Sequence, residues 1–384
     1  MEIIIRRIKS IYILRCFLFK PVICLLFFAG SAKGQSPPAT DSSLFYDSHF
    51  HLTNYIQEGI DIHAFLQVMG TKAGRSTLFG IPLQQQWEYG NSGDYAPSYY
   101  LASDAPLYYY SFTDAYIAMV YKSITPEEQK RFDPMITGFN PTDMYAADHI
   151  KRVLKLFPNV FSGIGEFTIH KEFVSSKISG ETASLTNPAL DRILDFAGQV
   201  GLVVLIHNDI DMPFPKGGQE PYLLKQLGEL FRRHPNTTII WAHMGLGRIV
   251  QPIPDQLRII ERALADSTLN HVHIDISWNE VAKYIVASPA ATKATADLIN
   301  KYPNRFLFGT DEVAPATQET YLRVYEMYGP LFKQLTPETK NKLLKGNYER
   351  IFDAARIKVR LWEKSNVARP VTVPQPTPVS GTPE

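Results

Sequence analysis

Eight short runs with strand character recur along the chain and alternate with helix-compatible sequence. They are rich in β-branched and aromatic residues, and turn residues stand at their ends. The runs are residues 43–52, 76–83, 134–141, 161–169, 202–208, 237–244, 271–277 and 305–312. Amphipathic segments lie between several of them, at residues 146–157, 188–201, 220–235 and 291–303. This alternation predicts an α/β fold, specifically a (β/α)8 TIM barrel of parallel strands.

A doubly wound open sheet is the alternative architecture. No glycine-rich phosphate loop follows the first strand-like run, so the barrel is preferred. No shift in composition divides residues 35–367, and we predict a single (β/α)8 domain over this range. Residues 368–384 are rich in proline and nearly free of core-forming side chains, which predicts a disordered or polyproline tail. A linker role for this tail is left open.

The first 34 residues have the order of a secretory signal. Basic residues come first, the apolar run 22–30 follows, and small residues precede a cleavage site before Gln35. An uncleaved membrane anchor is the competing interpretation. However, Lys20 and Pro21 interrupt the segment, and the apolar run is shorter than the roughly 20 residues that a spanning helix needs. We therefore predict a cleaved signal peptide over residues 1–34, a periplasmic or secreted protein, and no membrane span after cleavage.

Cysteine content and charge restrict the mature chain further. Both cysteines, Cys16 and Cys24, lie in the signal, so stability must come from a packed core without disulfides. The signal also holds six basic residues and one acidic residue, so its removal changes the formal net charge from +1 to about −4. This charge argues against a nucleic-acid partner. The expected partner is a small-molecule substrate, and assembly into a homo-oligomer is left open.

Imidazole and carboxylate groups stand at the carboxyl ends of five predicted strands. They are His49 and His51 on the first strand, Glu166 on the fourth, His207 on the fifth, His243 on the sixth and Asp311 on the eighth. The reactive groups of a (β/α)8 barrel gather at this end of the strands. Each residue taken alone would more often cap a carbonyl or pack in a core, but six at one end indicate a divalent metal site.

Strand geometry supports two parts of this prediction. Residues i and i+2 of a strand point to the same face about 6.6 Å apart, so His49 and His51 can bind one ion while Phe50 faces the helices. The same alternation on the seventh strand directs Asp275 and Ser277 toward the barrel interior. There they would support the ligands or contact substrate; a hydrogen-bonded core role is the alternative.

Several segments resemble a known family. They are DSHFHL (47–52), GIGEF (163–167), LIHN (205–208), WAHMG (241–245), GTD (309–311) and GNYERIF (346–352). This ordered set resembles the amidohydrolase superfamily, specifically its amidohydrolase-related (family 2) subgroup, over residues 44–355. The resemblance implies a (β/α)8 barrel with divalent metal held by the histidines of strands one, five and six and the strand-eight aspartate. Many binuclear members bridge two ions with a carboxylated lysine on strand four. Here Glu166 takes that place, as in members that bridge with glutamate, and Lys171 is interpreted as a loop residue beyond the strand end.

Two arrangements of metal follow from this resemblance. If Glu166 bridges, one ion would bind His49, His51 and Asp311, and the other would bind His207 and His243. If one ion binds, its ligands would be His49, His51, His207 and Asp311, and His243 would act as an acid or base or hold an oxyanion. In either case Asp311 would accept a proton from the attacking water and pass it to the leaving group. Zinc suits this donor set best, with manganese, iron and nickel as alternatives.

The substrate must be recognised by loops, and one predicted loop is unusual. Residues 83–112 follow the second strand on the active-site side and are rich in tyrosine. Trp87 and Tyr89 in this loop would form an aromatic substrate wall; an ordered surface loop or a dimer contact is the alternative. His170, Lys171 and Asn208 lie beside predicted ligands and are further candidates for substrate contacts.

Three classes of function remain open. The first is an exported metal-dependent hydrolase that cleaves a C–N, ester or lactone bond of a small organic molecule. The second is a non-oxidative, metal-dependent decarboxylase of a small aromatic or unsaturated carboxylic acid. The third, a catalytically silent binding protein, is disfavoured because all six ligand-type residues are present.

Overall fold

The computed structural model describes residues 42–54, 59–81, 110–172, 174–175, 177–178, 181–214 and 218–367. All of them belong to one compact unit, Asp41–Glu384. The predicted signal peptide and the predicted tail lie outside the described residues, so both stay predictions. Residues 83–109 of the tyrosine-rich segment also lie outside the described residues.

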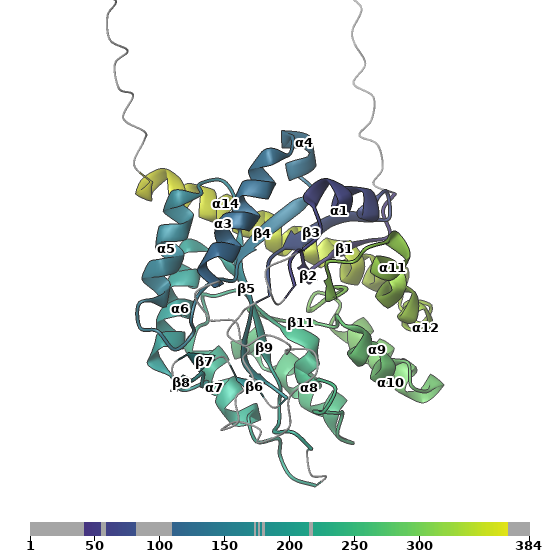
Figure 1. Cartoon of the computed structure of the whole chain (residues 1–384). Helices are drawn as coiled ribbons and strands as arrows, with labels where there is room; N and C mark the ends of the chain where they lie inside the picture. Colours follow the sequence, from purple (N-terminus) through teal and green to yellow (C-terminus); the bar gives the residue numbers. More distant parts are fainter. Residues whose placement is uncertain are drawn as a thin grey trace, which may run out of the picture. The chain divides into compact units, whose positions relative to one another are not determined.

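Eight parallel strands form the central sheet, in the order of the chain (Figure 1). They are β1 (Phe45–Asp47), β3 (Ala73–Leu78), β4 (Phe132–Ile136), β5 (Gly163–Lys171), β9 (Val203–Asn208), β10 (Ile239–Trp241), β11 (Val272–Asp275) and β12 (Phe306–Leu307). The sheet closes because the Ser48 N–H donates to the Phe308 carbonyl at 3.1 Å, and because β2 (Phe50–His51) pairs in parallel with β13 (Glu312–Val313). The predicted barrel is confirmed, and each of the eight predicted runs overlaps one of these strands.

Two short antiparallel pairings follow the fourth strand of the barrel in the chain. β6 (Val174–Ser175) pairs with the end of β5, and β7 (Lys177–Ile178) pairs with β8 (Glu181–Thr182). Because β5 continues to meet β6, Lys171 is its last residue. The prediction that Lys171 lies beyond the strand end is therefore wrong.

Helices connect the strands and cover the outside of the sheet (Figure 1). They are α1 (Ile62–Met69), α3 (Tyr110–Ser123), α4 (Pro126–Gln129), α5 (Ala146–Leu156), α6 (Pro188–Val200), α7 (Leu224–Arg233), α8 (Gln256–Ala265), α9 (Asn279–Ile285), α10 (Pro289–Lys301), α11 (Gln318–Met327), α12 (Gly329–Phe332), α13 (Pro337–Asn341) and α14 (Asn347–Asn366), with the short helices η2 (Ala242–Gly245), η3 (Ser267–Leu269) and η4 (Lys342–Gly346). Among the described residues, no helix is long and apolar enough to cross a membrane.

Local sequence explains where these helices begin and end, as α6 illustrates. The Asn187 side chain accepts a hydrogen bond from the Ala189 N–H, and Pro188 occupies the first turn, where no backbone donor is needed. Gly201 ends the helix in the left-handed conformation, at φ 86°, and donates its N–H to the Ala197 carbonyl.

Side chains of β9 alternate between two hydrophobic clusters. Val204 and Ile206 belong to the larger cluster, which lies between the sheet and the helices. Val203 and Leu205 belong to the smaller cluster, inside the barrel. Because the alternation has a period of two, His207 continues the inward-facing series at the carboxyl end of the strand.

Asp133, at the amino end of β4, is fully buried and joins two strands to the last helix. Its carboxylate accepts hydrogen bonds from Arg75 at 2.8 Å, from Arg356 at 2.6 Å and from the Tyr348 hydroxyl at 2.8 Å. Tyr348 also packs in the inner hydrophobic cluster. The start of α14 is therefore fastened at the amino end of the barrel, opposite the predicted site.

Replacing Asp133 by alanine should reduce the free energy of unfolding by roughly 3 kcal/mol, because two arginines would lose their buried partner. Urea unfolding followed by circular dichroism measures this change. Arg258→Ala, which removes an exposed ion pair with Asp255, is the matched control and should change stability by less than about 1 kcal/mol. Equal effects of the two substitutions would contradict a structural role for the Asp133 network.

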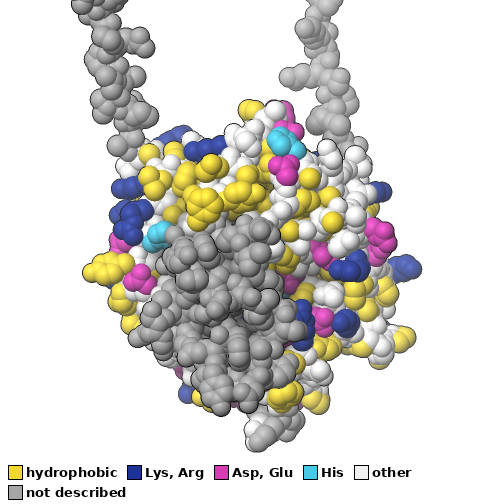
Figure 2. Space-filling model, in the orientation of Figure 1, with side chains coloured by type: hydrophobic (Ala, Val, Ile, Leu, Met, Phe, Trp, Pro, Cys, Tyr) yellow, Lys and Arg dark blue, Asp and Glu magenta, His cyan; other side chains and the backbone are white. Residues whose placement is uncertain are grey.

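Figure 2 shows hydrophobic side chains gathered over the region of α3 and α5. The exposed residues there include Phe112 and Met119 on α3 and Leu156 on α5. Nothing in the described part of the chain identifies an occupant for this surface. The homo-oligomer left open by the sequence therefore stays a prediction.

Candidate metal centre

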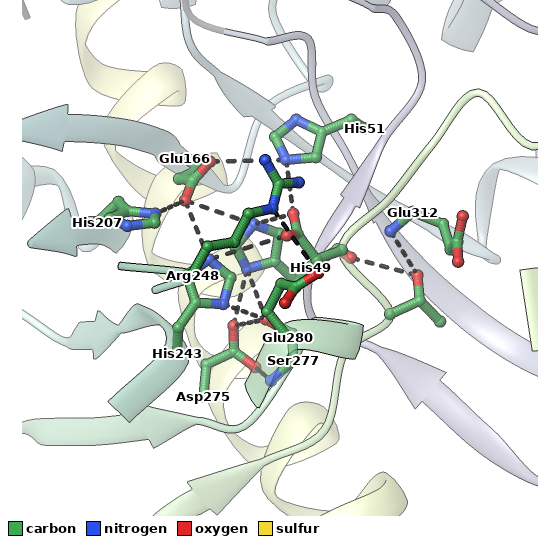
Figure 3. A network of polar contacts seen from close by, with 12 residues as sticks. His49, His51, Glu166, His207, His243, Arg248, Asp275, Ser277, Glu280 and Glu312 are labelled. Carbon is green, nitrogen blue, oxygen red and sulfur yellow. Dashed lines mark hydrogen bonds and ion pairs between the residues drawn. The ribbon is translucent and has the colours of Figure 1, made fainter. Parts of the chain in front are cut away.

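The six predicted ligand residues lie close together at the carboxyl ends of the barrel strands. Figure 3 shows five of them, His49, His51, Glu166, His207 and His243. Two groups of their ligand atoms share Glu166, and within each of these groups the atoms lie within 4.8 Å of one another. The first group is His49, His51, Glu166 and Asp311, and the second is Glu166, His207 and His243.

The first group combines the two histidines of β1–β2 with two carboxylates. Nε2 of His49 lies 3.2 Å from Oδ1 of Asp311, and Nε2 of His51 lies 3.1 Å from the same oxygen. Oε2 of Glu166 is 3.6 Å from Nε2 of His51. As strand geometry predicts, Phe50 points the other way and stacks on Phe65 of α1, with ring centroids 3.8 Å apart.

The second group lies around the other oxygen of Glu166. Oε1 is 2.6 Å from Nδ1 of His207 and 3.4 Å from Nε2 of His243. Glu166 thus directs one carboxylate oxygen toward His51 and the other toward the histidines of the fifth and sixth barrel strands. This is the position expected of a bridging ligand.

The histidine ring nitrogens that have no hydrogen-bond partner indicate whether a divalent ion fits the site. Nε2 of His49 and Nε2 of His243 are buried and have no hydrogen-bond partner among the described residues. Their Nδ1 atoms are occupied, by Asp275 at 2.7 Å for His49 and by Ser277 at 3.0 Å for His243. Metal-binding histidines are held in this way, with the outer nitrogen donating to an oxygen and the inner nitrogen left for the ion. The residues present therefore fit a divalent metal.

The electrostatics of the cluster lead to the same conclusion. Burial lowers the pKa of His49, but the carboxylates of Asp311 and Glu166 outweigh burial and hold that pKa well above its usual value. Burial would raise the pKa of Glu166, yet Lys171, His207 and His49 hold it well below its ordinary range. The pKa of Asp311 is likewise lowered, against burial, chiefly by His49. The carboxylates are ionised, and the cluster attracts positive charge that a divalent cation can supply.

The pKa of His243 is shifted below its usual value, in the opposite direction to that of His49. Burial lowers it, and the charges of His207 and His49 lower it further, although the Glu166 carboxylate, as a hydrogen-bond acceptor, raises it. A neutral imidazole is the form that binds a metal ion.

Four strained or crowded backbone positions place the ligands. His243 and Asp311 have left-handed backbones, with φ of 58° and 54°, which side chains other than glycine rarely adopt. Gly165 has a φ of +116°, and a Cβ there would lie 2.2 Å from the Leu205 carbonyl oxygen. A Cβ on Gly309 would lie 2.6 Å from the Cβ of His49. These glycines allow β5 and the residues after β12 to approach their neighbours closely.

Two aspartates that support the site were not identified from the sequence. Asp47 accepts hydrogen bonds from the backbone N–H of His49 at 3.1 Å and of Thr310 at 2.8 Å, which ties the first strand to the last. Asp209 lies 3.3 Å from Nε2 of His207. Each stands two residues from a ligand, so the alternation used for His49 and His51 would have found both.

The predicted substrate residues have different surroundings. Trp87 and Tyr89 lie outside the described residues. Asn208 is buried and donates to the Asp209 carbonyl at 2.7 Å, and His170 is half-buried on β5. Asp275 and Ser277 hold the outer nitrogens of His49 and His243, so they occupy the ligand-supporting position that the sequence left open.

A cavity of about 180 Å³ opens beside the cluster. His51, Glu166 and Asp311 line it on the side of the metal centre. Its remaining lining includes residues that are not predicted ligands, among them Lys171, Arg248 and Trp278. Arg248 and Trp278 stand in loops after the strands, where no sequence pattern marked them.

Asp275 orients two metal-site histidines at once. Its Oδ2 atom contacts Nδ1 of His49, and it accepts a hydrogen bond from the Ser277 hydroxyl at 2.6 Å, which in turn contacts His243.

Asp275→Asn should therefore weaken zinc binding by about 10- to 100-fold, measured by competition with a chelating dye. Ser277→Ala should weaken it less, and the double variant should fall short of the sum because the residues act as a unit. Asp255→Asn on the surface is the control. Wild-type zinc affinity in Asp275→Asn would rule out this positioning role.

Comparison with known proteins finds a matching family model. The model of a family described as Amidohydrolase (Amidohydro_2) matches residues 46–354, which span the barrel and all six ligand residues. A search of curated proteins finds no match.

Several solved structures resemble the chain at low identity. A putative 2-pyrone-4,6-dicarboxylic acid hydrolase from Pseudomonas putida is 15% identical, with a TM-score of 0.49, over 81% of this chain and 98% of that chain. An amidohydrolase from Burkholderia multivorans with bound zinc is 13% identical, with a TM-score of 0.49, over 81% and 99%. A 2,6-dihydroxybenzoate decarboxylase complexed with 2,6-dihydroxybenzoate is 14% identical, with a TM-score of 0.49, over 81% and 99%. At this similarity none of these activities transfers to the chain.

Proposed function

Since this chain belongs to the amidohydrolase family, whose members are enzymes of the metal-dependent hydrolase type, we propose that it hydrolyses a C–N, ester or lactone bond of a small organic molecule. One observation carries the proposal most directly. The carboxylate of Glu166 lies between the histidine pair of the first strand and the histidines of the fifth and sixth, with Asp311 beside the first pair.

The residues divide into two ligand sets for two divalent ions. His49, His51 and Asp311 form the first set, His207 and His243 form the second, and Glu166 belongs to both. Zinc is the metal we propose, because the donors mix imidazole and carboxylate. Bound there, a divalent ion supplies Lewis-acid chemistry, which activates water and polarises a carbonyl oxygen near neutral pH.

Asp311 is the residue that moves the proton. It is ionised, and it lines the cavity, where its carboxylate can receive a proton from attacking water and pass it to the leaving group. His243 is fully buried beneath the cavity and does not line it. In the arrangement with two ions, His243 therefore acts as a ligand and Asp311 acts as the acid and base.

A test of this function uses zinc-loaded protein and a panel of lactones, esters and amides of small organic acids. We expect hydrolysis of at least one member, loss of that activity after metal removal and its return with zinc. Hydrolysis that survives complete metal removal would refute the metal-dependent mechanism.

A non-oxidative decarboxylase is the second candidate. The observation that favours it is the ammonium of Lys171 in the wall of the cavity, close to the metal centre, where a carboxylic acid substrate would be attracted. Release of CO2 from aromatic carboxylic acids, without any hydrolysis in the panel, would replace the hydrolase with this lyase.

We also propose that the enzyme is exported, on the strength of the signal-like residues 1–34. Amino-terminal sequencing of the protein from periplasmic and medium fractions should show a chain that begins at Gln35. A full-length chain found only in the cytoplasm would overturn this part of the proposal.

A further inference from the structure

Lys171 is a buried cation whose charge no described residue neutralises at short range. Only 7% of the residue is exposed, and its ammonium has neither a hydrogen bond nor an ion pair within 4.0 Å among the described residues. Its ammonium lies against the ring of Trp278, whose centroid is 5.1 Å from Nζ. Burying a lysine without a carboxylate partner is costly, and a cation–π contact offsets only part of that cost.

The position of Lys171 is fixed by the fold. It is the last residue of β5, held by register with β6 and five residues beyond Glu166 on the same strand. Lys171 lines the cavity together with Glu166 and Asp311, so it lies close to the metal centre.

A second cation faces the same indole. The guanidinium carbon of Arg248 lies 5.2 Å from the Trp278 ring centroid, and Arg248 also lines the cavity. Nε of Arg248 stands 3.7 Å from Glu280, a distance at which the pair is loose (Figure 3). The residue contributes positive charge to the cavity even though it has protein partners.

Trp278, whose ring lies beside both cations, has an unusual backbone conformation. Its φ of 83° is left-handed, where a bulky side chain is strained, and its indole is buried against His243, with ring centroids 5.0 Å apart. Strain of this kind persists where the surrounding structure fixes it and is found at binding sites. The indole therefore links the cationic wall of the cavity to the metal centre.

The charge balance of the cavity determines what can bind. Glu166 and Asp311 are the carboxylates that face the metal centre, and divalent ions there would neutralise them. Glu312 also lines the cavity, but it pairs with Arg323 at 3.1 Å. Lys171 and Arg248 then line one side of a small cavity with positively charged groups.

From this arrangement we infer that Lys171, with Arg248 and Trp278, forms a subsite for a carboxylate group of the substrate, set apart from the group that reacts at the metal centre. The inference rests on the proposed function and narrows its substrate class to small organic acids that carry an anionic substituent beside the reacting bond. The ammonium and guanidinium donate charge-assisted hydrogen bonds to the carboxylate, and the indole packs against the substrate.

The test compares a ligand that carries carboxylates with one in which both are esterified. Zinc-loaded protein is titrated calorimetrically with phthalate, which has two carboxylates, and with dimethyl phthalate, which has none. We expect wild-type protein to bind phthalate more tightly than the diester. Lys171→Met should weaken phthalate binding by about 10- to 100-fold and leave diester binding within about twofold, because only a carboxylate loses its partner.

Matched variants complete the experiment. Lys171→Arg keeps the charge and should retain most of the preference for phthalate, whereas Arg248→Met should lose part of it. Arg258→Met removes the same charge from an exposed surface pair and should have no effect. If Lys171→Met fails to fold by circular dichroism, Lys171→Gln replaces it in the same comparison.

Two results would overturn the subsite. One is phthalate binding by Lys171→Met, or by Lys171→Gln, as tight as in wild type. The other is an equal loss of both ligands with unchanged zinc content, which would show that Lys171 serves only the architecture of the cavity. Zinc content and hydrolysis of the substrate panel are measured separately, so failure of the proposed function is distinguishable from failure of the subsite.

Discussion

Asp311→Asn should reduce turnover of a confirmed substrate by about 10²- to 10⁴-fold, because asparagine cannot accept the proton of the attacking water. The side chain keeps its size and can still lie beside Nε2 of His49 and His51. Steady-state kinetics gives the loss, and metal analysis of the same sample shows whether zinc is retained. Loss of turnover with zinc still bound assigns the proton transfer to Asp311.

Glu312→Gln is the matched control for this experiment. Glu312 is the next residue and a carboxylate in the same cavity, but it pairs with Arg323 and not with the histidines. Its replacement should leave turnover within a few-fold of wild type. Unchanged turnover in Asp311→Asn, or equal losses in both variants, would defeat the assignment.

Zinc should stabilise the protein strongly. Without metal, the buried imidazoles and carboxylates of the site lie close together. The carboxylates of Asp311 and Glu166 then hold the pKa of His49 above its usual value. A ligand that binds only the folded state adds about 2.7 kcal/mol when its free concentration is 100 times its Kd. Urea unfolding of metal-free protein, with and without zinc, should show a gain of this size.

Variants of two histidines test whether this gain in stability comes from the metal centre. His51→Ala and His207→Ala should each lose much of it, because each removes a ligand from one of the two sets. Asp255→Asn on the surface should keep it. A zinc effect that is the same in all four proteins would mean that zinc binds elsewhere.

The ligand set could be predicted from sequence because strand alternation is local. His49 and His51 face one side since residues two apart on a strand must do so, and the inward series of β9 ends at His207 for the same reason. The barrel then brings these strand ends together whatever the loops do. The same rule, applied to Asp47 and Asp209, would also have found two supporting carboxylates.

Other features depended on contacts that local pattern does not encode. Lys171 belongs to β5 because a short antiparallel strand, β6, pairs with its end, and a count of residues from Glu166 did not reveal this pairing. The indole of Trp278 reaches the cavity through a left-handed backbone, which no propensity favours in tryptophan. The direction of each carboxylate oxygen of Glu166 depends on its contacts with His51, His207 and His243, which come from other parts of the barrel.

The account depends most on the metal centre, and metal stoichiometry tests it most directly. Wild-type protein and Glu166→Gln are loaded with zinc, freed of unbound metal by gel filtration and analysed by inductively coupled plasma mass spectrometry. We predict two ions per wild-type chain and fewer in Glu166→Gln, because Glu166 belongs to both ligand sets. One ion per wild-type chain would contradict the bridging role of Glu166, and a protein that binds no divalent ion would contradict the metal centre itself.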